Sequence, residues 1–371
     1  MHSRYKFNLW RRFLAVFVVS FILAGSALAA LVIVVDPYGI RVGAGDEPRP
    51  IVDINQRFMY PQLARSHLYN AAVFGTSSLR LIDPEELDRL FAPSSGEPIH
   101  FANLAMNAAT PWEQMQLARL FLRAQPAPQV LIVGIDRPWC DRLADTPEKR
   151  LTFRTFPERF YDDNHWNDWL DTLNMKSLEI SIRLMSHRLG LRDVSLRDDG
   201  YGIFVPPDNL YDPTRARTHI WAENAAKGLP AEVTPQNPPV IPTAQEQAAW
   251  QFPAADWLDA LLQQVPAQTQ VYILFPPAHI SAQPRPGSLL AAEDSACKQH
   301  FTAIGARHNA TVLDFRKASS ITREDANFWD PLHYRLPFAS RIAQSLVRPD
   351  TADDFYDIIR RRAPNHPSSA Q

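Results

Sequence analysis

A single apolar segment near the N-terminus restricts the architecture of this chain more than any other feature. Residues 13–35 read FLAVFVVSFILAGSALAALVIVV and contain no charged side chain. A helix of that length can cross a hydrocarbon core of about 30 Å. The sequence therefore predicts a transmembrane signal anchor at residues 13–35, preceded by a tail at residues 1–12.

The charged residues on either side of this segment indicate its orientation. Basic side chains precede it and an acidic one follows it: Arg4, Lys6, Arg11 and Arg12 on one side, Asp36 on the other. The side that is rich in Lys and Arg faces the cytoplasm in single-pass proteins. We therefore expect a cytoplasmic tail at residues 1–12 and the rest of the chain outside the cytoplasm.

A cleaved signal peptide is the alternative interpretation of the same segment. Ala27-Leu28-Ala29 fits a small-x-small cleavage site. The apolar run continues past that site as far as Val35, which favours an uncleaved anchor. Both interpretations export the remainder of the chain.

Composition narrows the class of protein further. The 371 residues suffice for one large domain or for one domain with an insertion. The formal net charge is −2 and no long basic stripe occurs, so no nucleic-acid partner is expected. Cys140 and Cys297 could form a disulfide in an oxidising compartment, and two buried free thiols are the alternative. Their spacing matches no zinc site, and neither a metal nor another cofactor is expected.

Short apolar runs that alternate with amphipathic stretches predict an α/β fold with a doubly wound, mainly parallel five-stranded sheet. Thr110 followed by Pro111 is a typical helix start. The expected strands are residues 71–74, 99–102, 129–133, 270–275 and 311–315, and further expected helices are residues 252–265, 288–309 and 336–347.

One long stretch interrupts this alternation. Residues 140–250 contain a helical candidate at residues 165–189 and a Pro-rich part, but no clear strand pattern. We interpret this stretch as an insertion that roofs the ligand crevice at the carboxyl ends of the strands. The expected organisation is a lead-in at residues 36–70, a domain at residues 71–348 and a C-terminal tail at residues 349–371.

Two segments carry residues typical of a serine hydrolase. Ser77 follows the first expected strand in Gly75-Thr76-Ser77-Ser78, although such a turn is often only a tight turn. Asp330 and His333 are three residues apart, which on one helical turn places a carboxylate beside an imidazole. That pair could orient a general base, and an incidental surface turn is the alternative.

Two further segments follow the second and third expected strands. They are Asn103-Leu104-Ala105-Met106-Asn107-Ala108 and Gly134-Ile135-Asp136-Arg137. Polar side chains or backbone N–H groups at these positions could complete an oxyanion hole. Loop capping is the alternative for each segment alone.

The four segments, each after its expected strand, resemble the sequence blocks of the SGNH/GDSL hydrolase superfamily. The resemblance implies that Ser77 is the nucleophile and that Asp330 and His333 complete the catalytic set. It also implies an oxyanion hole at the backbone of Ser77 and Ala108, with Asp136 at the position of the family's asparagine. It covers residues 71–345 without the insertion.

Three positions depart from the family pattern. Thr76 replaces the aspartate that usually precedes the nucleophile, which leaves Ser77 in place. Ala108 stands where a glycine is expected, so the backbone N–H survives but fewer conformations are open to it. Asp136 replaces an asparagine whose side-chain amide donates a hydrogen bond to the oxyanion in that family. An ionised carboxylate has no proton to donate, and its negative charge repels the oxyanion.

The anchor adds a resemblance to bacterial relatives that acetylate alginate and other exopolysaccharides. It implies a serine esterase or O-acyltransferase, held at the inner membrane with its domain in the periplasm, that acts on ester groups of cell-envelope or secreted polysaccharide. A multi-pass membrane acyltransferase is the partner that this implies. The alternative is a non-catalytic carbohydrate-binding or assembly protein of an exopolysaccharide system with the same fold.

Three more residues are candidates for substrate binding. Asn107 lies in the segment after the second strand, and His279 follows the fourth strand in Phe275-Pro276-Pro277-Ala278-His279. Trp112 adjoins a motif and could stack on a sugar ring. A loop histidine packed by prolines and a buried packing tryptophan are the alternatives.

Overall fold

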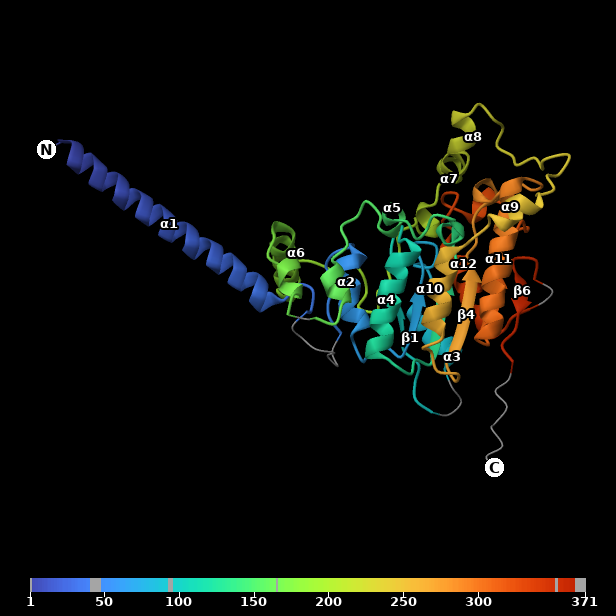
Figure 1. Cartoon of the computed structure of the whole chain (residues 1–371), viewed down its shortest axis with the longest axis horizontal. Helices are drawn as coiled ribbons and strands as arrows, with labels where there is room; N and C mark the ends of the chain where they lie inside the picture. The colour runs from blue at the N-terminus through green and yellow to red at the C-terminus, as the bar shows by residue number, and fades with distance from the viewer. Residues whose placement is uncertain (1, 41–47, 93–95, 165, 351–352, 364–371) are drawn as a thin grey trace.

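A long N-terminal helix projects from an α/β body in the computed structural model of this chain (Figure 1). The structure describes residues 2–40, 48–92, 96–164, 166–350 and 353–363, with side chains from Leu9 onward. Helix α1 spans His2–Val35, and its part Leu9–Val35 is long and apolar enough to cross a membrane. The predicted span at residues 13–35 lies within this part.

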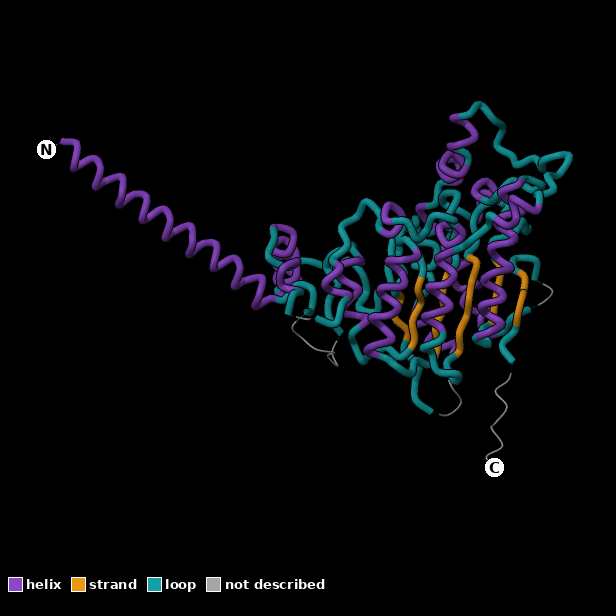
Figure 2. Tube along the Cα trace, in the orientation of Figure 1, coloured by secondary structure: helices purple, strands orange, loops and turns teal. Residues whose placement is uncertain are grey.

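Among the described residues, six strands form one sheet (Figure 2), and their order is β2-β1-β3-β4-β5-β6. The first five strands run parallel to one another, so the predicted α/β class with a mainly parallel sheet is confirmed. The strands are β1 (Ala71–Phe74), β2 (Phe101–Asn103), β3 (Val130–Gly134), β4 (Gln270–Phe275), β5 (Thr311–Asp314) and β6 (Asp357–Arg360).

The expected number of five strands is too low by one. Strand β6 lies in residues 349–371, which the sequence analysis assigns to a tail, and it pairs antiparallel with β5. Its side chains alternate between exposed and partly buried. Four residues with that pattern at a sheet edge give no periodic signal that separates them from an irregular tail.

Two apolar cores, one on each face, hold the sheet. Ala72 and Phe74 of β1 belong to the first core, and Ala71 and Val73 belong to the second, as the two-residue period of a strand requires. Helices that contribute to the first core include α4 (Pro111–Ala124), α10 (Pro253–Leu262) and α11 (Leu289–Arg307); those of the second include α3 (Pro84–Phe91) and α12 (Leu336–Val347).

Helix α4 begins where the sequence predicts. Thr110 is the N-cap and accepts a hydrogen bond from the N–H of Glu113 (3.1 Å), and the Glu113 carboxylate accepts one from the N–H of Thr110 (3.0 Å). This reciprocal capping box satisfies two backbone donors that a helix start otherwise leaves unpaired. The helix therefore starts at a fixed point next to the loop that follows β2.

The lead-in at residues 36–70 contains a helix that was not predicted from the sequence. Helix α2 spans Gln56–Ala64 and contacts α4, with most of its side chains buried. Pro61 lies inside it, and a proline in a short segment obscures a helical pattern. This helix carries Arg57, which becomes important at the candidate site.

The inserted residues between β3 and β4 form short helices around two ends of the body. Helix α6 contacts α1, whereas α7 and α8 rise above the edge of the sheet at which the parallel strands end (Figure 1). The helices are α5 (Pro147–Arg150), α6 (Met175–Arg188), α7 (Pro213–Ile220), α8 (Ala222–Ala226) and α9 (Ala244–Ala248). Short 3₁₀ turns lie at Arg137–Cys140, Glu158–Tyr161, Asp168–Asp171, Asp208–Leu210, Ile280–Ala282 and Asp325–Asn327.

The two cysteines form a disulfide, which decides between the two alternatives left by the sequence. Cys140 at the start of the insertion is bonded to Cys297 in α11, with Cα atoms 5.7 Å apart. The bond ties the segment after β3 to a core helix. It closes a loop that includes the whole insertion.

The strand order determines where a ligand crevice can form. The chain passes from β1 to β2 on one side and returns to β3 on the other, so the order reverses between β1 and β3. In open α/β sheets, ligands bind outside the carboxyl ends of the strands at such a switch point. The turns after β1 and β3 carry Ser77 and Asp136, respectively.

Candidate active site

Ser77 lies on a tight turn directly after β1. The N–H of Leu79 donates to the carbonyl of Thr76 (3.0 Å), and the N–H of Arg80 donates to the carbonyl of Ser77 (3.3 Å). The Leu79 side chain covers the ends of both neighbouring strands, and a Cβ atom on Gly75 or Gly134 would collide with it. The two glycines therefore let Leu79 close the turn while Ser77 stays partly exposed.

Asp330 and His333 lie on a second turn, between the 3₁₀ turn at Asp325–Asn327 and α12. One carboxylate oxygen of Asp330 accepts the N–H groups of Leu332 (2.9 Å) and His333 (3.0 Å), and the other contacts His333 Nδ1 (2.6 Å). The expected helical turn is wrong here, because the aspartate side chain organises the turn instead. The two side chains still meet, since the same short segment holds both.

The two turns bring Ser77, His333 and Asp330 into one hydrogen-bonded chain. Ser77 Oγ lies 2.7 Å from His333 Nε2, although the residues are 256 positions apart. The hydroxyl of Tyr334 donates to the carbonyl of Ser78 at 2.5 Å and so fastens one turn to the other. This geometry lets the imidazole accept the serine proton while the carboxylate holds the opposite ring nitrogen.

The environment of Asp330 keeps this carboxyl group ionised. Burial alone would raise its pKa, but the hydrogen bond and charge of His333, with the N–H groups of Leu332 and His333, lower the pKa below its ordinary value. A carboxylate that stays ionised stabilises an imidazolium on the neighbouring ring. The pair therefore has the electrostatics of a general base with its orienting acid.

The loop after β2 lies beside the Ser77 turn. The N–H of Met106 donates to the carbonyl of Gly75 (3.0 Å), and Ala108 and Ser77 each lie two residues beyond one end of that bond. Ala108 is exposed and has a φ of 50°, a conformation that favours glycine. Within the described part of the chain, neither the N–H of Ala108 nor that of Ser77 has a protein acceptor. Both are available to an anion.

Arg57 of α2 supports the loop that carries Asn107 and Ala108 through buried hydrogen bonds. Its guanidinium pairs with both carboxylate oxygens of Glu113 (2.9 and 2.6 Å), and both side chains are fully buried. A remaining donor reaches the carbonyl of Asn107 (3.1 Å). Sequence reasoning missed this pair because Arg57 lies in the lead-in, where no helix was expected. The capping position of Glu113 in α4 was the one local signal of a role for either residue.

Asn107 and the insertion meet next to the imidazole. Arg80 donates to Asn107 Oδ1 (2.7 Å), and its guanidinium lies 4.9 Å from the ring centre of Phe204. The same ring contacts His333 edge to face, with centres 5.0 Å apart. The insertion therefore contributes Phe204 to one wall of the site. Asn107, from the loop after β2, is joined to the same wall through Arg80.

Asp136 lies next to the Ser77 turn at the end of β3. Thr76 donates to Asp136 Oδ2 (2.5 Å), whereas Oδ1 is buried and has no hydrogen-bond partner. Burial raises the pKa of Asp136 to about 6, against the opposing hydrogen bond of Thr76 and the charge of Arg316. Although the residue as a whole is partly exposed, its carboxyl group faces inward.

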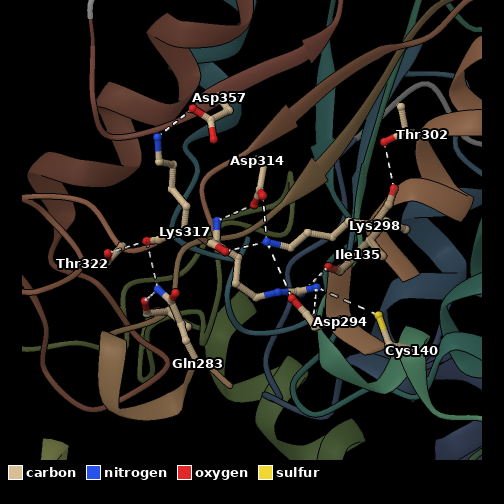
Figure 3. Close-up of polar contacts among 12 residues, drawn as sticks. Ile135, Cys140, Gln283, Asp294, Lys298, Thr302, Asp314, Lys317, Thr322 and Asp357 are labelled. Carbon is tan, nitrogen blue, oxygen red and sulfur yellow. Dashed lines mark hydrogen bonds and ion pairs between the residues drawn. The ribbon is translucent and has the colours of Figure 1, made fainter. Parts of the chain in front are cut away.

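A buried ionic cluster supports the segment that carries Asp136. Arg316 donates to the carbonyl of Ile135 (2.8 Å) and pairs with Asp294 (3.0 Å). Lys298 bridges Asp314 (2.7 Å) to the backbone of Arg316 (2.6 Å), close to the disulfide (Figure 3). This cluster holds the end of β3 against β5 and α11.

Among the described residues, no side-chain hydrogen bond or ring contact joins His279 or Trp112 to Ser77, Asp330 or His333, although the N–H of His279 donates to the carbonyl of Pro331 (2.8 Å) in the turn between Asp330 and His333. His279 is fully buried between Trp221 and Phe328, with Nε2 3.1 Å from Asp325, so it forms part of the packing under α7. Burial lowers its pKa more than the charge of Asp325 raises it. Sequence reasoning could not anticipate this, because Trp221 comes from the insertion.

Trp112 borders a separate cavity of about 520 Å³ beside α4. Its ring contacts Phe156, and Tyr161 and Arg159 also line the cavity. Trp139, which follows β3, is fully buried against Phe301. These two tryptophans therefore do not form a common aromatic surface at the Ser77 turn.

The described residues contain no group of three or more His, Cys, Asp or Glu side chains that could hold a metal ion. In comparisons with known proteins, no family model and no curated protein matches the sequence of this chain. The arrangement of its own residues is thus the basis for assigning a function.

Proposed function

We propose that this protein is a membrane-anchored serine esterase or O-acyltransferase of the SGNH/GDSL type. The observation that supports it is the chain Ser77 Oγ–His333 Nε2 (2.7 Å) and His333 Nδ1–Asp330 Oδ2 (2.6 Å) at the carboxyl edge of the sheet. A serine, an imidazole and a carboxylate in this order activate a hydroxyl for attack on an ester.

In the acylation step, His333 Nε2 takes the proton of Ser77 as Oγ bonds to the ester carbonyl carbon. The carbonyl oxygen becomes an oxyanion, and the N–H groups of Ser77 and Ala108 stabilise it. The imidazolium then gives its proton to the departing alcohol as the carbon–oxygen ester bond breaks. Asp330 stabilises the imidazolium throughout this step.

In the second step, an alcohol or water attacks the acyl-Ser77 intermediate. His333 accepts the proton of the attacking hydroxyl and returns one to Ser77 Oγ when the acyl bond breaks. Water as acceptor gives an esterase, whereas a sugar hydroxyl gives an O-acyltransferase. Phe204, from the insertion, bears on this choice because its ring packs edge to face with the imidazole and limits the space for water beside it.

The likeness to the SGNH type is supported by the site segments and by the strand order. The Ser77 turn follows β1, the Asn107–Ala108 loop follows β2 and Asp136 follows β3, at the switch point of the sheet. The free N–H groups of Ser77 and Ala108 suit the oxyanion hole of that family. The departures at Ala108 and Asp136 lie within the same site.

The proposed location is the periplasmic side of a bacterial inner membrane. The basic residues before the apolar run at residues 13–35 favour a cytoplasmic N-terminus, and the disulfide suits an oxidising compartment. The substrate class proposed for that location is acylated cell-envelope or secreted polysaccharide. For the transferase reaction, a multi-pass membrane acyltransferase is the proposed donor of the acyl group.

The proposal is tested by hydrolysis of p-nitrophenyl acetate with the full chain in detergent. We expect Ser77→Ala to lower kcat/KM by at least about 10³-fold, because the attacking oxygen is removed. Ser186→Ala on α6 is the control and should keep wild-type activity. Equal turnover by wild type and Ser77→Ala would rule out this nucleophile.

A non-catalytic carbohydrate-binding or assembly protein is the second candidate function, and Asp136 favours it. An ionised carboxylate beside the Ser77 turn repels a developing oxyanion. In this reading, the wild-type chain binds acetylated polysaccharide without turning over any ester. Isothermal titration with acetylated and deacetylated polysaccharide, run beside the hydrolysis assay, distinguishes the two functions.

A further inference from the structure

Helix α6 in the insertion carries an apolar stripe that no other part of the described chain covers. Met175 (78% exposed), Ile182 (53%), Met185 (40%) and Leu189 (70%) are apolar residues at solvent. At 3.6 residues per turn, these positions fall within an arc of about 80°. The stripe is therefore one continuous face.

The face that attaches α6 to the protein is a different one. Ser177, Ile180, Ser181 and Leu184 are buried, and Ser177 Oγ lies 3.4 Å from the hydroxyl of Tyr38. The apolar stripe therefore lies outside the face that is buried against the protein. Its composition has to be explained by a surface outside this chain.

Exposed apolar side chains also lie just before and just after α6 in the chain. Trp166 is 91% exposed and Leu170 71% in the approach to the helix, and Leu191 is 77% exposed after it. We call the exposed apolar side chains of residues 166–194 the α6 surface. Contiguous apolar patches on soluble domains mark sites of interaction with another protein or a membrane.

The position of α6 next to α1 favours a membrane, rather than another protein, as the partner of the α6 surface. Helix α6 contacts α1 and lies beside the C-terminal end of α1, where that helix joins the body (Figure 1). Asp53 locks it there through Lys176 (3.0 Å) and Arg183 (2.9 Å). The α6 surface therefore lies at the level at which a membrane-spanning α1 leaves the bilayer.

We infer that the α6 surface docks on the phospholipid bilayer that α1 spans, with α6 as an interfacial amphipathic helix. Apolar side chains of such helices enter the boundary between headgroups and acyl chains. Trp166 is a residue type that favours this interface, and the exposed Arg188 and Arg192 suit anionic headgroups. The inference goes beyond the proposed activity and rests on α1 as the membrane span.

Docking at α6 would restrict how the domain moves on its anchor. A single helix lets a domain rotate about the membrane normal and tilt, whereas a second contact beside it removes the tilt. The Ser77 turn would then stay at a constant orientation relative to the bilayer. This matters for an enzyme that receives acyl groups from a membrane protein or acts on a nascent polymer.

Spin labels on the full chain in phospholipid vesicles test this inference. Cys140 and Cys297 are bonded to each other, so an introduced cysteine is the only free thiol. Label depth is measured from collisions with oxygen and with a water-soluble nickel chelate. We expect labels on Ile182→Cys and Leu189→Cys to lie about 5–10 Å into the headgroup and acyl boundary.

Two further labels make the result decisive. Ile241→Cys is a matched exposed position (87%) on the insertion between α8 and α9, and should report water. Phe17→Cys within α1 should report the hydrocarbon core. Water-like values at Ile182 and Leu189 with a deep label at Phe17 would overturn docking but leave the span intact.

Other outcomes also overturn the inference. A water-like label at Phe17 would remove the span itself, independently of whether the protein hydrolyses esters. Spin–spin broadening at Leu189 without lipid contact would assign the stripe to a second copy of this chain instead.

Discussion

The carboxyl group of Asp136 lies beside the turn that carries Ser77, where Thr76 donates to its Oδ2 atom. Its Oδ1 atom is buried without a partner, and burial raises the pKa to about 6. A protonated Asp136 is neutral and can donate one hydrogen bond, whereas the ionised form can only accept. The protonation of this residue is therefore expected to influence a reaction at Ser77.

Asp136→Asn should stabilise the fold at pH 8 and leave it nearly unchanged at pH 4. The pKa of Asp136 in the folded state, about 6, exceeds the ordinary aspartate value of 3.8, so the stabilising effect of its proton is present below about pH 4 and is lost as the pH rises through 6. The difference is worth up to about 3 kcal/mol. Urea unfolding of the full chain in detergent at the two pH values measures it.

The same substitution should raise esterase activity at pH 8. The asparagine oxygen can accept from Thr76, which leaves the amide N–H₂ as a donor where Oδ1 now lies without a partner. One added donor is worth up to about 100-fold in kcat. Asp256→Asn, at an exposed position on α10, is the control for both measurements. A stability gain that is equal at both pH values would contradict the pKa assigned here.

Single residues were the part of the site that sequence could best predict. The spacing of Asp330 and His333 is local, so the sequence alone indicated that the two side chains meet. Their contact with Ser77 depended on the strand order, which the doubly wound pattern made plausible. His279 was placed at the same sheet edge for the same reason, yet Trp221 from the insertion buries it.

At the scale of elements, α2 and α4 hold the loop that carries Asn107 and Ala108. The capping box sets the start of α4, and the same Glu113 carboxylate pairs with Arg57 of α2. Ala108 keeps a φ of 50°, which is unfavourable for a residue with a Cβ atom. Contacts of the neighbouring carbonyls with Arg57 oppose relaxation of this strained position.

Arg57→Leu should lower the free energy of unfolding by about 3–5 kcal/mol, because it leaves the buried Glu113 carboxylate without its cation. It should also lower esterase activity, since the carbonyl of Asn107 loses a hydrogen-bond donor. Urea unfolding and p-nitrophenyl acetate hydrolysis measure the two effects.

The exposed pair Lys227–Glu223 of the α8 region provides the matched control. Lys227→Leu removes a similar charge pair at the surface and should change stability by less than about 1 kcal/mol. Equal effects of the two substitutions would show that burial of Arg57 and Glu113 has no energetic consequence.

Elements with a long apolar pattern were predicted well, and short or mixed ones were not. Helix α12 and strand β4 have the expected bounds, because each buries one continuous set of apolar side chains. Helix α2 contains a proline, and β6 is a four-residue edge strand. Their formation depends on partners elsewhere, such as α4 and β5, which local sequence does not reveal.

At the scale of the whole molecule, the disulfide and the ionic cluster next to it join the insertion to the body. The bond links residues 157 positions apart, and Arg316 lies 4.0 Å from the sulfur of Cys140. Asp294 and Lys298 lie in the same cluster as Cys140 (Figure 3). A crosslink across so long a loop limits the conformations of the unfolded chain. The bond therefore fixes the start of the insertion to α11.

Replacing both cysteines, Cys140→Ser with Cys297→Ser, should lower the free energy of unfolding by about 2–5 kcal/mol. Urea unfolding of the full chain in detergent measures the change. Treatment of the wild type with a reductant should produce a similar shift, and the double variant should not respond to the reductant. An unchanged midpoint in the double variant would show that the bond does not stabilise the fold.

The most direct test of the proposed chemistry is covalent labelling of Ser77 by a fluorophosphonate, followed by intact-protein and peptide mass spectrometry. A fluorophosphonate phosphonylates a serine whose proton is taken by a neighbouring base, with loss of fluoride, so folded wild type should gain one adduct on the Ser77 peptide. Ser77→Ala should gain none, and His333→Ala should react at least about 100-fold more slowly. A wild-type protein that stays unlabelled, or a Ser77→Ala variant labelled equally well, would contradict the account.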